Sequence, residues 1–468
     1  MHQSLHSRYN PLGEAERYLD SLDLHGDFRF FILIEPGIGY LLSPLRQRYP
    51  SSKIISIHAK DMPEMISRPD SFWYPGSKKS LRDFLEQEIP ETEAALIKVI
   101  EWRPAMAVYK EAYRFLLSET VEFLKQTDAS ARTMKQFGQK WFKNFFKNLI
   151  FFSKILIPAP FSFPLLITGA GPSLEETIPL IQKERSNLLL LAVSSSVSAL
   201  KACGLEPDII ISSDGGNWAL LHLYECIREN EDIKLAVSLN AALPSQCKNS
   251  SFLLVSDGSL WQELILQRLE IPFISLPQRG TVSAAALDLA FALSDSMVFL
   301  TGVDLSHKDI QTHARPYSFD RIWEEKAGRF SPVYSQVFLR SLLIRTGGSN
   351  DIYASWFSRQ LAAYPKQLHS LGPNNPVFQE LETRSLKTQE SGLKKPVWKT
   401  MRIKQNKHLI KEIVYFLIGA LKNPLYNTRL MEELRALIIP GNAQASMEEL
   451  TERIIFLTRP FWELMSSE

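Results

Sequence analysis

Short continuous hydrophobic runs, separated by helical segments, dominate the middle of the chain. The runs are Leu165–Thr168, Leu188–Val193, Asp208–Ser212, Lys234–Leu239, Phe252–Val255, Phe273–Leu276 and Met297–Thr301. Strands that are apolar along their whole length are typical of a parallel sheet covered by helices on both faces. The pattern therefore predicts a doubly wound, mostly parallel, Rossmann-like α/β domain at residues 158–378.

The first part of the chain repeats this pattern on a smaller scale. Phe28–Ile34 and Lys53–Ile57 are apolar runs, and between them lies the glycine turn Gly37–Tyr40, followed by a helical stretch. A strand, a glycine turn, a helix and a second strand predict a small N-terminal α/β domain at residues 1–90.

The rest of the chain predicts helices. The pattern is helical over Thr92–Asn148, where an aromatic stripe includes Trp141 and Phe145. It predicts a helical connector at residues 91–157, with the stripe in a core; docking on a membrane or an acidic partner is the alternative. The lysine-rich stretch Glu390–Lys411 predicts a solvated linker, with contact to an acidic protein, a lipid or a nucleic acid left open. Three segments predict a helical region within residues 379–468: Leu409–Ala420, Thr428–Ile438 and Met447–Leu457.

Composition narrows the class of protein. The chain has 468 residues, 45% of them hydrophobic, which suits more than one core. Its 53 basic and 51 acidic residues show no excess of the kind that nucleic-acid binders carry, so we expect no nucleic-acid partner. The 3 cysteines lack CxxC spacing, which favours a reducing compartment and argues against structural zinc. With no leader pattern and no unbroken apolar span, we expect a cytoplasmic protein without a transmembrane segment.

The clearest chemical motif is Gly169–Leu174, GAGPSL, which follows one predicted strand and opens a helix. Gly169 and Gly171 allow a sharp turn whose N–H groups approach an anion, and Ser173 is expected to cap the helix. A helix N-terminus favours phosphate. We therefore predict a nucleotide phosphate site here, which includes Ala170 and Pro172; a tight turn without a ligand is the alternative.

Polar residues follow the next two strands. Ser194 and Ser195 could bind a ribose or a phosphate, or cap the following helix. Asp214 could hold ribose hydroxyls or a metal, or close its own loop as an Asx-turn. Trp218 could stack on a base or pack under the loop.

A second glycine turn opens the small-residue helix after Arg279. Gly280, Thr281 and Ser283 are candidate ligand contacts, with a helix packed closely on the sheet as the alternative. The last candidates are Gly302 and Asp304, at the end of the strand Met297–Thr301, and the histidines beyond them. His313 is the leading acid–base candidate and His307 its competitor, because histidine titrates near neutral pH.

These motifs together resemble the motility-associated factor (Maf) glycosyltransferases, whose core is MptE-like, after 6-hydroxymethylpterin diphosphokinase MptE. The resemblance is carried by GAGPSL, by GTVSAAALDLAFAL at residues 280–293, by GVDLS at residues 302–306 and by EWRPA at residues 101–105. A more distant similarity is to bacterial sialyltransferases that use CMP-sialic acid. On that analogy Asn374 lies at the edge of the donor pocket. Ala170 stands where those enzymes usually carry asparagine.

The resemblance implies transfer of a nonulosonic, sialic-acid-like sugar from a CMP donor to Ser or Thr of flagellin. Our own candidates for the catalytic residues of that reaction are His313 and Asp304, although the catalytic histidine of the sialyltransferases lies further downstream than His313; no cofactor would be needed. The alternative it implies is a diphosphokinase that moves diphosphate from ATP to a pterin alcohol, with Mg²⁺ held by Asp214 and Asp304. A non-catalytic protein that binds a nucleotide or flagellin is the third hypothesis, and a homo-oligomer stays open.

Overall fold

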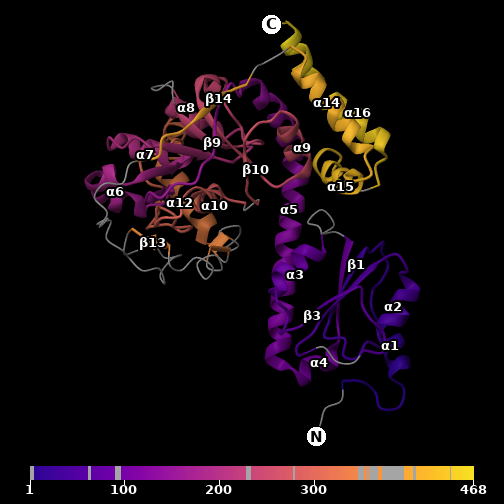
Figure 1. Cartoon of the computed structure of the whole chain (residues 1–468). Helices are drawn as coiled ribbons and strands as arrows, with labels where there is room; N and C mark the ends of the chain where they lie inside the picture. The colour runs from indigo at the N-terminus through magenta and orange to yellow at the C-terminus, as the bar shows by residue number, and fades with distance from the viewer. Residues whose placement is uncertain are drawn as a thin grey trace. The chain divides into compact units, whose positions relative to one another are not determined.

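The structure is a computed structural model, and it divides into two compact units, Met1–Gln136 and Phe137–Glu468. It describes residues 5–61, 65–89, 96–227, 233–277, 280–345, 353–354, 356–357, 367–371, 395–403, 407–442 and 444–467. Figure 1 shows the first unit in indigo and purple, and the second running from purple through magenta and orange to yellow.

The first unit is built on a parallel sheet of four strands in the order β3-β2-β1-β4. The strands are β1 (Phe30–Ile34), β2 (Lys53–Ile57), β3 (Ser71–Trp73) and β4 (Ile97–Glu101). Its helices are α1 (Pro11–Asp20), α2 (Leu42–Arg48), α3 (Leu81–Glu88) and α4 (Arg103–Val108). The helix α5 (Lys110–Phe151) follows them. The strand, glycine turn, helix and strand that the sequence predicts are all present.

Strand β4 corrects the helical interpretation of Thr92–Asn148. It pairs with β1 residue for residue, from Phe30 opposite Ile97 to Ile34 opposite Glu101. Its β-branched residues favour a strand, and the partner that makes it one lies far away in the sequence. Only the part from Lys110 onward forms the predicted long helix.

The second unit contains a sheet of 10 strands, of which nine form one path in the order β13-β12-β6-β7-β8-β9-β10-β5-β14, while β11 pairs with β10. The strands are β5 (Lys154–Leu156), β6 (Leu165–Thr168), β7 (Leu189–Val193), β8 (Ile209–Ser212), β9 (Lys234–Ser238), β10 (Ser251–Ser256), β11 (Ile274–Ser275), β12 (Val298–Thr301), β13 (Leu368–Ser370) and β14 (Thr400–Arg402). All neighbours are parallel except β14, which runs antiparallel to β5. The prediction of a Rossmann-like α/β fold with a mostly parallel sheet is confirmed.

Helices connect these strands. They are α6 (Ser173–Glu184), α7 (Val197–Ala202), α8 (Ala219–Ile227), α9 (Leu260–Arg268), α10 (Val282–Leu293), α11 (Asp320–Glu325) and α12 (Val333–Arg345), with the 3-10 turns η2 (Arg185–Asn187), η3 (Ser194–Ser196) and η4 (Ser245–Asn249). Helix α10 lies against the sheet, since Ala286 and Ala290 share one buried core with Ile167 and Leu191. Its small residues therefore serve close packing.

The strand order reverses next to β6. The chain first runs outward through β7, β8, β9 and β10, and later returns to place β12 and β13 on the other side of β6. In sheets of this kind ligands bind outside the carboxyl ends of the strands at such a reversal. The turns that begin at Gly169 and Gly302 both lie at this point.

The sheet reaches beyond the predicted limits of its domain, residues 158–378, because β5 and β14 form one edge. Thr400–Arg402 falls in the stretch interpreted as a solvated linker, and that interpretation is wrong for these three residues. They pair with Lys154–Leu156, and the nearby Lys395 forms an ion pair with Asp208 at 3.2 Å. As with β4, pairing with a strand far away in the sequence makes these residues a strand.

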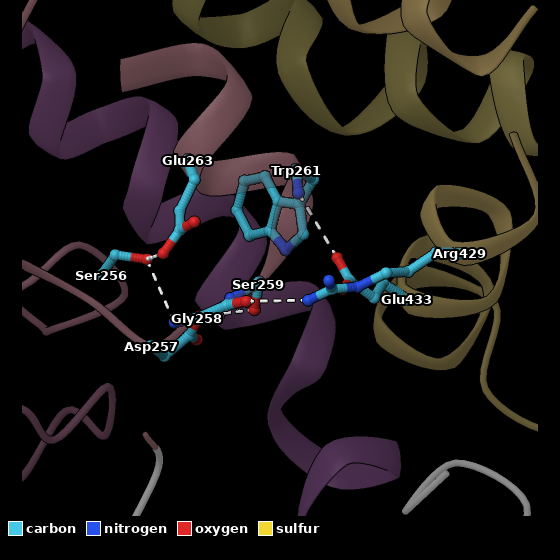
Figure 2. A network of polar contacts seen from close by, with 8 residues as sticks. All are labelled: Ser256, Asp257, Gly258, Ser259, Trp261, Glu263, Arg429 and Glu433. Carbon is cyan, nitrogen blue, oxygen red and sulfur yellow. Dashed lines mark hydrogen bonds and ion pairs between the residues drawn. The ribbon is translucent and has the colours of Figure 1, made fainter. Parts of the chain in front are cut away.

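The predicted C-terminal helices are present as α14 (Leu409–Leu421), α15 (Asn427–Ile438) and α16 (Met447–Ser467). Helix α15 is fastened to the turn between β10 and α9. Arg429 donates to the Gly258 carbonyl at 3.1 Å, and Glu433 accepts from the Trp261 N–H at 3.4 Å (Figure 2).

Trp261 also contacts the aromatic stripe of α5, since its ring lies 4.7 Å from that of Phe145. This supports the core interpretation of that stripe. No helix among the described residues has the length and apolar character to cross a membrane.

Candidate functional site

The GAGPSL turn after β6 and the GVDL turn after β12 are in direct contact. Gly169 donates to the Thr301 carbonyl at 2.8 Å, and Gly171 donates to the Gly302 carbonyl at 2.6 Å. A Cβ atom at Gly169 would lie 2.2 Å from the Gly302 oxygen, and one at Gly302 would lie 2.3 Å from the Gly169 oxygen. These two glycines allow two backbone segments to meet at the reversal point.

Asp304 adds hydrogen bonds between the same two turns. Its carboxylate, 5% exposed, accepts the Ser173 backbone N–H at 2.8 Å and also the Ser173 hydroxyl. Burial raises the pKa of Asp304, and the two bonds from Ser173 oppose that rise. The expected N-cap role of Ser173 is wrong: Ser173 is the first residue of α6, and the carboxylate from the neighbouring strand end caps the helix instead.

This geometry bears on the predicted phosphate site. The N–H groups of Gly169, Gly171 and Ser173 all donate within the protein. A phosphate at the N-terminus of α6 would meet the carboxylate of Asp304, so binding there requires that carboxylate to move or to be protonated. The structure places Asp304 as a residue that positions two turns, and the phosphate-binding role remains a prediction.

The loop that carries His313 packs on the same turn. Ala314 donates its N–H to the Ala170 carbonyl at 2.7 Å. Gln311 and Arg315 both donate to Glu175 in the first turn of α6, at 2.6 and 2.7 Å. The first and last motifs found in the sequence therefore come together. His307 is held differently, with Nδ1 2.7 Å from the Asp309 carbonyl oxygen.

His313 is largely buried and carries no charge at neutral pH. Its Nδ1 lies 2.9 Å from the Thr312 hydroxyl, and its ring stacks on Tyr317 at 4.0 Å. Burial, then the positive charge of Arg340, then His222 lower the pKa of His313 to about 3. A neutral imidazole is the form that can accept a proton.

Two partly buried histidines, His222 and His313, predict a loss of stability in mild acid. Burial lowers the pKa of His222 to about 4, whereas an unperturbed histidine titrates at 6.5. Between these values the unfolded chain binds more protons, so stability is complete above pH 6.5 and falls as the pH drops toward 4 and 3. Each histidine should cost about 2 kcal/mol between pH 7 and pH 5.

Thermal unfolding at pH 7 and pH 5 measures this effect. His222→Gln and His313→Gln should each reduce the difference between the two pH values. If both variants keep the full pH dependence of the parent protein, other groups cause it.

An aromatic cluster surrounds His313. Tyr317 lies 5.3 Å from Phe319 and 5.9 Å from Trp323, measured between ring centroids. Beside the cluster is a hollow of about 480 Å³. Its walls are formed by Trp218, Phe319, Ile322, Trp323, Lys326, Gln336 and Arg340. The exposed fraction of Trp218 is 62%, so this ring is open to a ligand and is not packed under its loop.

Three further candidates from the sequence, Ser194, Ser195 and Asp214, lie in the turns that follow β7 and β8. Ser194 and Ser195 form the turn η3, whose third residue, Ser196, is buried and bonds to the Thr168 carbonyl at 3.0 Å. Asp214 is exposed, and its carboxylate accepts the Gly216 N–H at 2.7 Å. The Asx-turn that the sequence left open is therefore formed. The charge of Asp214 acts on His222, which joins its loop to the aromatic cluster.

The second glycine turn also has a structural role. Gly280 has a φ of +74°, and Thr281 caps α10, accepting the Ala284 N–H at 3.1 Å. Ser283 lies in the first turn of that helix. Asn374 and Arg279 lie outside the described residues.

A metal site does not form from the described side chains. Among them no three His, Cys, Asp or Glu residues gather as metal ligands would. Asp304 accepts two bonds from Ser173, and Asp214 closes its own turn. The described residues therefore do not fit a Mg²⁺ site at Asp214 and Asp304.

One family model matches the central part of the chain. Residues 139–309 match the family model described as 6-hydroxymethylpterin diphosphokinase MptE-like. The predicted resemblance to the MptE-like family is confirmed. The matched MptE-like segment holds the strands from β5 to β12 and both turns at the reversal point.

Two individual proteins are also similar. An uncharacterized protein of Treponema pallidum (strain Nichols) is 27% identical over 284 residues, which are 60% of this chain and 61% of that relative's length. A solved structure of the MAf glycosyltransferase from Magnetospirillum magneticum AMB-1 is 13% identical, with a TM-score of 0.48, and the match covers 97% of this chain and 80% of that one.

The residues that sequence reasoning missed lie mostly beyond the MptE-like segment. Phe319, Trp323, Lys326 and Arg340 come after residue 309, on or next to the helices α11 and α12. The available signal was the series of aromatic residues that follows His313, because large rings close together in a loop region often mark a ligand site.

Proposed function

We propose that the chain is a glycosyltransferase that moves a nonulosonic sugar from a CMP donor to a Ser or Thr hydroxyl of flagellin. The observation that carries the proposal is the position of His313. Its imidazole is neutral and partly buried, and its loop is bonded to the turn at the reversal point of the sheet. It also stacks on Tyr317, whose neighbours Phe319 and Trp323 line an open hollow.

The chemistry is a displacement at the anomeric carbon. The acceptor oxygen forms a bond to that carbon while the bond from the carbon to the donor phosphate breaks, and CMP leaves. The acceptor hydroxyl loses its proton to His313. When Nδ1 donates to the Thr312 hydroxyl, Nε2 is the basic nitrogen that takes the proton.

The diphosphokinase alternative rests on the description of the matched family. A flat pterin ring suits an aromatic hollow as well as a sugar does. That reaction transfers diphosphate from ATP and needs Mg²⁺. The sequence predicts Asp214 and Asp304 as its ligands, but in the structure both carboxylates accept other hydrogen bonds, which counts against this alternative. A non-catalytic protein that binds a nucleotide or flagellin is the third possibility.

Titration calorimetry of the full chain with CMP, and separately with ATP and Mg²⁺, tests the proposal. We expect CMP to bind at least ten times more tightly than ATP with Mg²⁺. Incubation with CMP-N-acetylneuraminic acid and flagellin should then add the mass of one or more sugar residues to flagellin. A preference for ATP with Mg²⁺ contradicts the proposal and favours the diphosphokinase. Binding of CMP without any mass change favours the non-catalytic hypothesis.

A further inference from the structure

The hollow beside His313 has two positive charges and no negative charge in its wall. Lys326 and Arg340 line it together with aromatic, aliphatic and amide side chains. Two acidic residues of α11 have other partners: Glu325 pairs with Arg321 at 2.9 Å, and Asp320 accepts the Tyr317 N–H at 2.9 Å. Within the part of the chain that the structure describes, neither Lys326 nor Arg340 forms an ion pair. A cavity of this composition is complementary to an anionic ligand.

We propose that this hollow binds a sugar ring that bears a carboxylate, with the ring against Trp218 and Trp323 and the carboxylate on Arg340 and Lys326. The inference rests on the proposed function, to which it adds the residues that recognise the acidic sugar. The volume of the hollow, about 480 Å³, lies within the range of small-molecule sites.

The aromatic rings of the wall supply faces on which a ring can stack. Trp218 is 62% exposed, and its centroid lies 5.8 Å from that of Phe319. Trp323 also lines the wall and is partly exposed. The apolar face of a sugar packs on such rings, while its hydroxyl groups stay available for hydrogen bonds.

Arg340 is held against an aromatic ring of the wall. Its guanidinium lies 4.8 Å from the centroid of Trp323, so the ring supports the flat group from one side. A guanidinium held in this way presents its N–H edge to a carboxylate and can form two parallel bonds. Lys326 adds a second positive charge on a flexible side chain, which can reach the carboxylate from several directions.

The position of Arg340 also couples sugar binding to the proposed base. After burial, the charge of Arg340 is the next cause that lowers the pKa of His313, and the same charge opposes the rise that burial produces in the pKa of Tyr317. A carboxylate bound to Arg340 would neutralise this charge. The pKa of His313 would then rise toward its ordinary value, and the imidazole would become a stronger base once the sugar is in place.

Ligand binding without any transfer reaction tests the proposal. N-acetylneuraminic acid and its methyl ester are titrated separately into the full chain, and tryptophan fluorescence and ligand-observed NMR follow the binding. We expect the acid to bind about 10–100 times more tightly than the ester, because only the acid forms charge-assisted bonds. Arg340→Met and Lys326→Met should reduce this preference, and the double variant should remove it. Arg321→Met, on the same segment but outside the wall, is the matched control and should keep it.

The outcomes separate this proposal from the proposed function. Equal affinity for acid and ester in the parent protein overturns the carboxylate site, whether or not the protein transfers sugar. A CMP affinity that falls in Arg340→Met, with an unchanged preference for the acid, also overturns it, because the hollow would then hold the nucleotide phosphate. A preference for the acid that depends on Arg340 supports the site even if no sugar reaches flagellin.

Discussion

Replacement of His313 by alanine is expected to reduce kcat/KM for sugar transfer by about 10²–10⁴-fold, the usual contribution of a general base. The neighbouring Ala314 bonds to the GAGPSL turn, and the His313 ring stacks on Tyr317 of the aromatic cluster, beside the hollow proposed for the sugar. Initial rates with a CMP-sugar donor measure the loss. His307→Ala is the matched control: it removes another histidine of the same loop, bonded to the Asp309 carbonyl, and should leave the rate within a few-fold.

Two further measurements separate a catalytic loss from a structural one. The affinity of His313→Ala for CMP should stay close to that of the parent protein. In addition, the pKa of about 3 predicts that kcat/KM of the parent protein does not fall between pH 8 and pH 5 through protonation of His313. An acid limb near pH 6.5 that persists in His313→Gln would assign the base to another group.

Local patterns of the sequence were sufficient for most of the sheet. Continuous apolar runs predicted the strands, and the glycine turns were correctly placed at their carboxyl ends. The short strands β3, β4, β5, β13 and β14 were not foreseen. Ile97–Glu101 and Thr400–Arg402, for example, become strands only through pairing with distant segments. Short strands of this kind depend on tertiary contacts more than on their own residues.

The candidate site was predictable only in part, for a similar reason. The motifs named His313 and Asp304, but the bond between Asp304 and Ser173 joins residues 131 positions apart. Nothing in the local sequence shows that a carboxylate will cap α6. The hollow was not predicted from the sequence, because Lys326, at the end of α11, and Arg340, on α12, belong to no motif. Only the folded chain brings them to one wall.

Substitution of Gly302 by alanine is expected to destabilise the second unit by about 3–5 kcal/mol. Gly302 has a φ of +67°, and a Cβ atom there would lie 2.3 Å from the Gly169 carbonyl oxygen, a backbone atom that cannot rotate away. Gly204 provides the control, with a φ of +72° and no atom within 4 Å of its added Cβ. Gly204→Ala should therefore cost only the strain of the left-handed conformation, about 1–2 kcal/mol.

The difference between the two variants, measured by urea unfolding of the full chain, isolates the contact between the turns. It also decides between two explanations of GAGPSL. If the glycines exist for backbone approach, Gly169→Ala should lower stability as well, because its Cβ would lie 2.2 Å from the Gly302 oxygen. If they exist mainly to admit a phosphate, Gly169→Ala should lose affinity for CMP while the urea midpoint stays unchanged. Because the bonds from Ser173 to Asp304 depend on the same contact, we expect loss of stability to come first, with weaker nucleotide binding as its consequence.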